Sequence, residues 1–387
     1  MKQLIAVFKR EVRQMTARPI YLVSSVIVTV FACIFFLTLM NEGVPQKLPI
    51  GIVDHDHTTI SRMLRREIDA GQGVEVIAEY MNFTEARQAM QRGEIYAFVE
   101  LPEHMYSDML AMKRPTVTVY ANDAYLLGGM LSYKQLMTMV NLASGAMQRE
   151  VMRGRGMRDG DIMPLIQPVV IDNHMLGNPW ANYPIYLATT ILPGILGLMV
   201  LTLCAFAITH EIKVGTSEEW METAGGNIFT AISGKMLPYT ILFTLLGWIV
   251  NIVLFGFMHF PMNGSFAFLC LATLVYVAAM QAAAVVVTSL VPVPRMAICL
   301  CVLYGVLAFS LSGFTYPVES MKPAFQAWSY LVPLRYYYLI TVDQMLMGVS
   351  VAKSCLWLAL MGAAMLLPLP LAKRLRNALL YHNYPDD

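Results

Sequence analysis

Between Leu311 and Arg335 the chain reads LSGFTYPVESMKPAFQAWSYLVPLR, directly after one of its most apolar runs. A hydrophobic run that ends at Ser312-Gly313 and then meets three prolines cannot continue as one membrane-spanning helix. Proline removes backbone donors and disfavours helical geometry in the residue before it. Irregular backbone survives at membrane depth only where it is buried in protein or lines a cavity. We therefore predict two short re-entrant or interfacial helices in this stretch.

The composition indicates an integral membrane protein. Hydrophobic residues make up 57% of the chain and charged residues 14%, and the mean hydropathy is +0.55, whereas soluble domains have about 45–50% apolar residues. Most of the charged residues lie between positions 41 and 181. This segment is therefore predicted to be a water-exposed domain that interrupts the membrane part. The six cysteines all lie in apolar runs, which argues against a disulfide framework.

Residues 1–19 are predicted to form an amphipathic helix on the cytoplasmic membrane surface. Ile5, Phe8, Val12 and Met15 recur at spacings of three and four, with Lys2, Lys9, Arg10 and Arg13 on other faces. Five basic residues before Pro19 place the N-terminus in the cytoplasm.

Six apolar runs are predicted to cross the bilayer. They are Ile20–Met40, Tyr183–Thr209, Met236–Met258, Ser265–Val291, Met296–Leu311 and Val351–Ala372. Alternate crossing puts both termini in the cytoplasm, with basic residues in the tail 373–387, and puts 41–181 and 312–340 outside. The membrane part resumes at 182–372 and contains one substantial cytoplasmic loop at 210–235.

The inserted segment has the alternating pattern of a small α/β domain. Strands are predicted at Leu48–Val53, Val74–Ala78, Ala97–Leu101 and Thr116–Tyr120, with helices starting near Asp54 or Thr58 and near Phe83. A long Met-rich helix from Tyr125 to about Arg153 and a strand near Val169–Asp172 follow. The predicted fold is thus an α-helical polytopic membrane protein with six transmembrane helices, an N-terminal surface helix and an inserted extracytoplasmic α/β domain.

The opening stretch also resembles the signature of ABC-2 type transporter permeases. The pattern is SGF, then Thr or Ile, an aromatic residue, P, Val or Ile, E, and a later PL with Arg or Thr. We predict an outer gate at its positions Ser312, Gly313, Phe314, Tyr316, Pro317, Glu319, Pro323, Pro333 and Arg335.

The loop from His210 to Lys235, HEIKVGTSEEWMETAGGNIFTAISGK, resembles the coupling pattern of the same family. There a short coupling helix sits in a groove of the ATPase subunit. Thr216 can accept from the first helical amides, and acidic residues suit the positive end of that helix. The candidate coupling residues are Glu211, Gly215, Thr216, Glu218, Glu219 and Glu222. The loop departs from the pattern at Trp220 and Ala224-Gly225-Gly226, and a solvated polar loop is the alternative.

Few residues suggest chemistry in this chain itself. No phosphate-binding loop is present in the sequence, so ATP and Mg²⁺ are assigned to a partner ATPase, and we predict no catalytic, cofactor-binding or metal-binding residues. Asp54-His55-Asp56-His57 has the residue types of a metal site, but a strand-to-helix turn capped by aspartate is favoured. No carboxylate is predicted at mid-membrane, which argues against proton-driven antiport.

The resemblance implies the permease subunit of an ATP-driven ABC-2 exporter in the bacterial inner membrane. Its apolar, Met-rich and aromatic spans favour a hydrophobic or amphiphilic substrate, drug-like or lipid-like, moved out of the cytoplasm or inner leaflet. Implied partners are a cytoplasmic ABC ATPase, a second permease in a homodimer or heterodimer, and membrane lipids, but no nucleic acid. The outer domain is also compatible with a periplasmic adaptor. The alternatives are a membrane receptor or scaffold with an extracytoplasmic sensing domain, and a membrane transferase.

Overall fold

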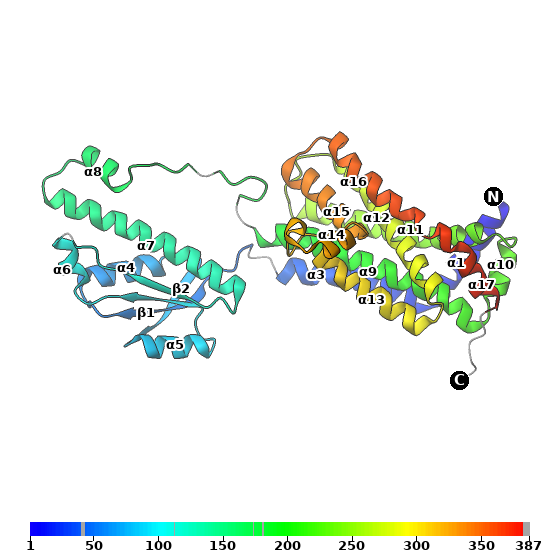
Figure 1. Cartoon of the computed structure of the whole chain (residues 1–387), viewed down its shortest axis with the longest axis horizontal. Coiled ribbons are helices and arrows are strands. Elements are labelled where there is room, and N and C mark those ends of the chain that lie inside the picture. The colour runs from blue at the N-terminus through cyan, green and yellow to red at the C-terminus, as the bar shows by residue number, and fades with distance from the viewer. Residues whose placement is uncertain (40–42, 112, 173, 180–181, 382–387) are drawn as a thin grey trace. The chain divides into compact units, whose positions relative to one another are not determined.

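The computed structural model describes residues 1–39, 43–111, 113–172, 174–179 and 182–381. The chain forms two compact units, which we call the bundle unit (Met1–Gly43 with Met175–Asp387) and the α/β unit (Val44–His174). Figure 1 shows the elements of both. The sequence placed the insertion at 41–181; positions 41 and 181, and the predicted end of the first span at 40, lie outside the described residues.

The α/β unit is built on a four-stranded sheet in the order β2-β1-β3-β4. Strand β1 runs parallel to β2 and β3, while β4 is antiparallel to β3. The strands are β1 Leu48–Asp54, β2 Val74–Tyr80, β3 Ala97–Leu101 and β4 Thr118–Ala121. The four strands predicted from the alternating pattern are therefore confirmed, with small differences at their ends.

Helices cover both faces of this sheet, as parallel strands require. Helices α4 (Thr59–Asp69) and α7 (Leu126–Gly154) lie on one face and α5 (Phe83–Gln91) on the other. Two hydrophobic cores result, one containing Ile50 and Ile52 and the other Val53 and Phe98. Helix α4 begins where Thr58 accepts a hydrogen bond from the amide of Ser61, as the sequence suggested.

The strand predicted at 169–172 is wrong. The chain leaves α8 (Asp159–Ile166) in an irregular segment, and the side chains of Val169, Val170 and Ile171 are 70–80% exposed. β-branched residues favour strands only where they pack against neighbours on a pleated surface. In the described part of the α/β unit no strand pairs with this segment, so its composition alone was misleading.

The described residues of the bundle unit contain six helices that are long and apolar enough to cross a membrane. They span Pro19–Leu39, Tyr183–Val214, Ile228–Phe257, Phe266–Leu290, Pro294–Leu311 and Val351–Tyr381. The first combines α2, a π turn and α3, and the last combines α16 with α17. Helices α9 (Tyr183–Val214) and α12 (Phe266–Leu290) are the most buried, and outward-facing Leu, Ile, Val and Phe cover the others. The six predicted spans are confirmed as helices.

Helix α9 approaches α12 closely because small residues line the contact. A Cβ on Gly197 would lie 2.0 Å from the hydroxyl oxygen of Tyr276 on α12. That hydroxyl donates a 3.0 Å hydrogen bond to the carbonyl oxygen of Pro193, within α9. The tyrosine thus takes the space that the glycine leaves.

One end of the bundle unit carries α1 (Lys2–Ala17), α10 (Ser217–Thr223) and α17 (Ala372–Tyr381); we call it the α10 end (Figure 1). The opposite end carries α14 (Pro323–Ser329) and α15 (Pro333–Thr341) and is called the α14 end. The expected tail at 373–387 begins as helix α17, which packs on α10 and α12 through buried Leu375 and Leu379.

Candidate functional site

The α10 end contains a buried network of charged side chains that joins three helices. Lys235 on α11 (Ile228–Ile252) places its ammonium 2.5 Å from an oxygen of Glu11 and 2.9 Å from an oxygen of Glu211. The three side chains are at most 2% exposed. Tyr239 donates to the other oxygen of Glu11 at 2.6 Å. Buried charges of this kind require partners, because desolvation is costly.

Arg10 completes the network. With Arg10 and Lys235 balancing Glu11 and Glu211, the network has a formal net charge of zero. Its guanidinium forms two hydrogen bonds with Glu211, at 2.7 and 2.9 Å, the bidentate geometry that makes such pairs strong. Burial alone would lower the pKa of Arg10, but the hydrogen bonds to Glu211 and its charge raise that pKa above its ordinary value. The sequence placed Arg10 on a face other than that of Ile5 and Val12, and in the structure Arg10 uses that position to reach Glu211.

Helix α1 docks on α11 through a face that sequence spacing did not identify. Val7 and Glu11, four residues apart, are both buried, and Val7 contacts the backbone of Gly234 closely enough that a Cβ there would lie 2.8 Å away. Of the apolar residues expected to define the helix, Met15 packs against the bundle core, whereas Ile5 is 45% and Val12 36% exposed. Those two side chains remain available to lipid.

Helix α10 is amphipathic in the way a coupling helix requires. Trp220, Met221 and Ala224 are buried on its inner face, where the Trp220 ring lies 4.8 Å from the ammonium of Lys235. Glu218, Glu219 and Glu222 are exposed on the outer face. Glu219 is also 3.6 Å from Arg10, so the acidic outer face is linked to the buried network.

The predicted coupling residues therefore separate into two groups. Glu211 and Thr216 belong to the buried network, because the Thr216 hydroxyl donates to Glu211 at 2.5 Å instead of capping α10. The expected cap at Thr216 is thus wrong. Gly215 ends α9 in a left-handed conformation at φ +77°, which suits glycine. The three outer glutamates are the group that a partner could reach.

The residues at which this loop departs from the family's coupling pattern have structural roles. Trp220 fills the space above Lys235, and Gly225 and Gly226 end α10 with φ values of +69° and +74°. A Cβ on Gly225 would lie 2.2 Å from the side chain of Gln3 on α1. Two glycines therefore let the chain turn tightly beside α1.

At the α14 end, Gly313 and Arg335 form the centre of the irregular region. Gly313 has φ +90°, and a Cβ there would lie 3.0 Å from a terminal nitrogen of Arg335. Arg335 is 8% exposed, lies 3.8 Å from Glu319, and covers the ring of Tyr330 at 5.6 Å. Among the described residues no hydrogen-bond partner reaches its Nε atom. Glycine is thus favoured by the backbone conformation, and a larger side chain would also press on Arg335.

Phe314 connects this region to the central helix. Its carbonyl oxygen accepts from the hydroxyl of Tyr186 on α9 at 2.9 Å, and the two rings stack with centroids 4.5 Å apart. The hydroxyl of Ser312 donates a 2.7 Å hydrogen bond to the carbonyl oxygen of Phe309 and accepts one from the amide of Phe314. The structure thus brings Ser312, Gly313, Phe314 and Arg335 together.

Glu319 also reaches this centre, through its 3.8 Å contact with Arg335, which leaves four signature positions. Tyr316, Pro317 and Pro323 are exposed, whereas Pro333 is buried. Pro323 and Pro333 begin α14 and α15, where a missing amide proton costs nothing. The two short helices expected in this stretch are therefore confirmed.

The Asp54–His57 segment is a capped turn. One oxygen of Asp54 accepts from the amides of Asp56 and His57, both at 3.0 Å, and the other accepts from Ser61 at 2.6 Å. Glu79, whose carboxylate lies within 4.8 Å of possible ligand atoms on Asp54 and His57, pairs with Arg65 at 2.5 Å. These contacts show that the segment forms the turn that leads into α4.

Sequence reasoning missed Glu11 and Tyr239 and treated Lys235 only as part of a pattern. The sequence does indicate that Glu11 is unusual. It lies one helical turn after Val7, on the same face, in a helix whose other charged residues are all basic. An acidic residue on the packed side of a basic helix indicates a buried cationic partner.

The sequence model of the ABC-2 family transporter proteins matches residues 19–368, which covers the α/β unit and most of the bundle unit. A comparison with curated proteins returned no match. Because the family model covers most of the chain, from the first span to the last, this protein belongs to the ABC-2 family of transporter proteins.

Proposed function

We propose that the chain is the transmembrane subunit of an ATP-driven exporter in the bacterial inner membrane, with the α10 end and both termini in the cytoplasm. Family membership makes it a multi-pass transport permease associated with an ABC ATPase. The partner would bind ATP and Mg²⁺ and hydrolyse the nucleotide. Drug-like or lipid-like amphiphiles are the proposed substrates, since the bundle offers mainly apolar side chains.

The observation that carries the proposal is the link between α10 and the bundle. A push on the acidic face of α10 reaches Arg10 through Glu219, then Glu211 and Lys235, which belong to α9 and α11. Buried, geometrically defined ion pairs move as a unit more readily than they stretch, because separation leaves charges unpaired. Motion of α10 would thereby move α1, α9 and α11 together.

The same reasoning makes the α14 end the proposed outer gate. Phe314 is held by α9 through Tyr186, and Arg335 on α15 lies against the Gly313 turn. Movement of α9 would therefore act on both short helices. A homodimer or heterodimer would supply the second half of the pathway, and a periplasmic adaptor would contact the α/β unit.

ATPase coupling tests the proposal. We expect Glu218→Arg/Glu219→Arg to abolish most stimulation of the ATPase by the reconstituted permease, because the charge of the outer face of α10 is reversed. Glu75→Arg/Glu103→Arg, exposed positions in the α/β unit, make the same change in net charge and should leave stimulation unchanged. Equal stimulation by both double variants would refute the role of α10 and favour a receptor or scaffold.

A further inference from the structure

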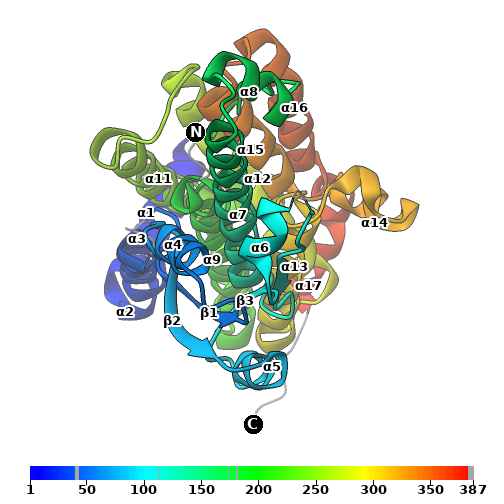
Figure 2. The same ribbon diagram turned by 90° about the vertical axis from the view of Figure 1, so that its left-hand side faces the viewer.

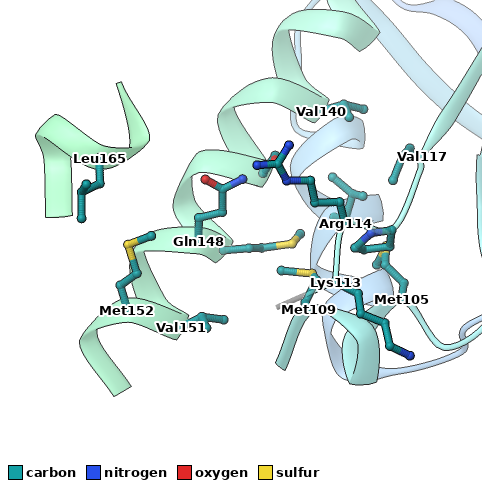
Figure 3. A pocket seen from close by; sticks show the side chains of 14 residues that line it. Met105, Met109, Lys113, Arg114, Val117, Val140, Gln148, Val151, Met152 and Leu165 are labelled. Carbon is teal, nitrogen blue, oxygen red and sulfur yellow. The ribbon is translucent and has the colours of Figure 1, made fainter. Parts of the chain in front are cut away.

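The α/β unit contains a cavity of about 490 Å³ that the transport role does not explain (Figure 3). It lies between α7, α6 (Met105–Leu110), α8 and the segment that leads into β4. Its volume is within the range of roughly 300–1,000 Å³ that is usual for small-molecule sites. All of its lining residues belong to the α/β unit.

One wall is a stripe along α7 with a small residue at its centre. Val140, Ser144, Met147 and Val151 recur at spacings of four, three and four, which puts them on one helix face. Three of the four are large and apolar, whereas Ser144 leaves space where a larger side chain would fill the cavity. The cavity therefore depends on the small side chain at position 144.

Part of the facing wall consists of flexible apolar side chains. Met105 and Met109 from α6 lie opposite the stripe, and Leu165 from α8 closes one side. Thioether side chains are flexible and polarizable, so they fit irregular or changing hydrocarbon surfaces. Helix α8 is held in place by Arg149 on α7, which makes two hydrogen bonds with Asp159 at 3.1 and 3.0 Å.

A cation lies at the edge of the cavity. In Figure 3 the guanidinium of Arg114 points toward the side-chain amide of Gln148. No ion pair or hydrogen bond to Arg114 occurs within the described part of the chain. Its neighbour Lys113 points away and pairs with Asp108 at 2.9 Å. Arg114 and Gln148 therefore remain able to donate to an anion.

We propose that this cavity binds a single-chain amphiphile with an anionic headgroup, such as an alkyl carboxylate. The tail lies among the methionines and valines, and Arg114 with Gln148 holds the headgroup. The Met and Val side chains along the walls offer none of the backbone partners that a bound peptide would need. The inference concerns binding to the α/β unit alone, so it stands or fails independently of coupling to an ATPase.

The test uses the full chain in phosphatidylcholine nanodiscs and decanoic acid carrying a photoreactive diazirine. We expect labelling concentrated on the peptides that contain Met147 and Met105, and displaced by unlabelled decanoate. Each buried methylene contributes roughly fourfold to binding. Ser144→Trp, which fills the cavity, should therefore lower labelling of these peptides by more than about tenfold.

Two further arms separate headgroup from tail. Arg114→Glu should weaken labelling about fivefold, less at high salt, because an exposed charge contributes modestly and is screened. Arg87→Glu on α5 is the matched control and should have no effect. The same diazirine tail with a trimethylammonium headgroup should label the site weakly, and labelling should persist in discs of phosphatidylglycerol.

Four results would overturn the assignment. They are labelling spread over the whole unit, labelling that Ser144→Trp leaves unchanged, equal labelling by the cationic probe, and displacement by phosphatidylglycerol, which would indicate a site for two-chain lipids. Arg114→Glu changes only an exposed side chain, so it remains a valid test even if Ser144→Trp fails to fold.

Discussion

Replacing Lys235 by methionine should release helix α1 from the bundle. Methionine fills a similar volume but leaves Glu11 buried with Tyr239 as its remaining partner. Removing one partner from a buried ion pair costs about 3–5 kcal/mol. When α1 separates, Glu11 reaches water, so this cost falls on the docked state. A change of about 3 kcal/mol corresponds to roughly a hundredfold more of the separated state.

Reaction of a cysteine placed at position 7 measures this separation. Val7 is 1% exposed in the docked helix, so Val7→Cys in a background without the six native cysteines should react slowly with a water-soluble maleimide. When opening and closing are fast, the rate follows the population of the open state. We expect Lys235→Met to raise the rate about a hundredfold in nanodiscs.

Two controls distinguish charge from packing. Glu11→Gln/Lys235→Met removes both charges of the Glu11–Lys235 pair and should bring the rate back to within roughly tenfold of the parent. Glu219→Gln removes an exposed ion pair, worth about 1 kcal/mol or less, and should change the rate by less than about fivefold. If Lys235→Met reacts at the rate of the parent, or if the double variant shows no recovery, the buried charges do not hold α1 on the bundle.

Other positions give further predictions. Gly313→Leu should abolish most transport at near-normal abundance, since φ +90° and Arg335 both exclude a side chain. Pro317→Leu, at an exposed position with φ −58°, should impair transport less, and equal transport by both variants would argue against the gate. Gly197→Ala should lower stability by about 1–3 kcal/mol through overpacking against Tyr276; Tyr276→Phe should partly restore it, as thermal unfolding in detergent can show. Thr58→Ala should destabilise the α/β unit by about 0.5–2 kcal/mol through loss of the α4 cap, whereas Thr138→Ala, an exposed position within α7, should have little effect.

Periodic and turn-forming features were predictable from the sequence, because local chemistry determines them. The strand at Ala97–Leu101 was placed at its observed ends, and the three prolines after Gly313 correctly indicated short helices. The segment at 169–172 shows the limit of this reasoning. Its composition favours a strand, but strand formation depends on a neighbouring strand that sequence alone does not reveal.

The charged network depended on tertiary contacts that spacing does not encode. Arg10 and Glu211 are 201 positions apart, and Lys235 and Glu11 are 224 apart. Counting basic residues in α1 correctly found its overall charge but did not reveal that Arg10 pairs with Glu211. The cavity beside Ser144 was likewise missed, because it results from packing between α7 and elements that are distant in the sequence.

Contact between the ATPase and α10 tests the proposed coupling role of this helix most directly. A photo-crosslinking amino acid would replace Glu222 on the outer face of α10 or, in a separate sample, Gln326 on α14, in the complex purified with its ABC ATPase. We expect cross-links to the ATPase from position 222 and none from position 326. Cross-links from position 326 alone, or from neither position in an active complex, would contradict that role.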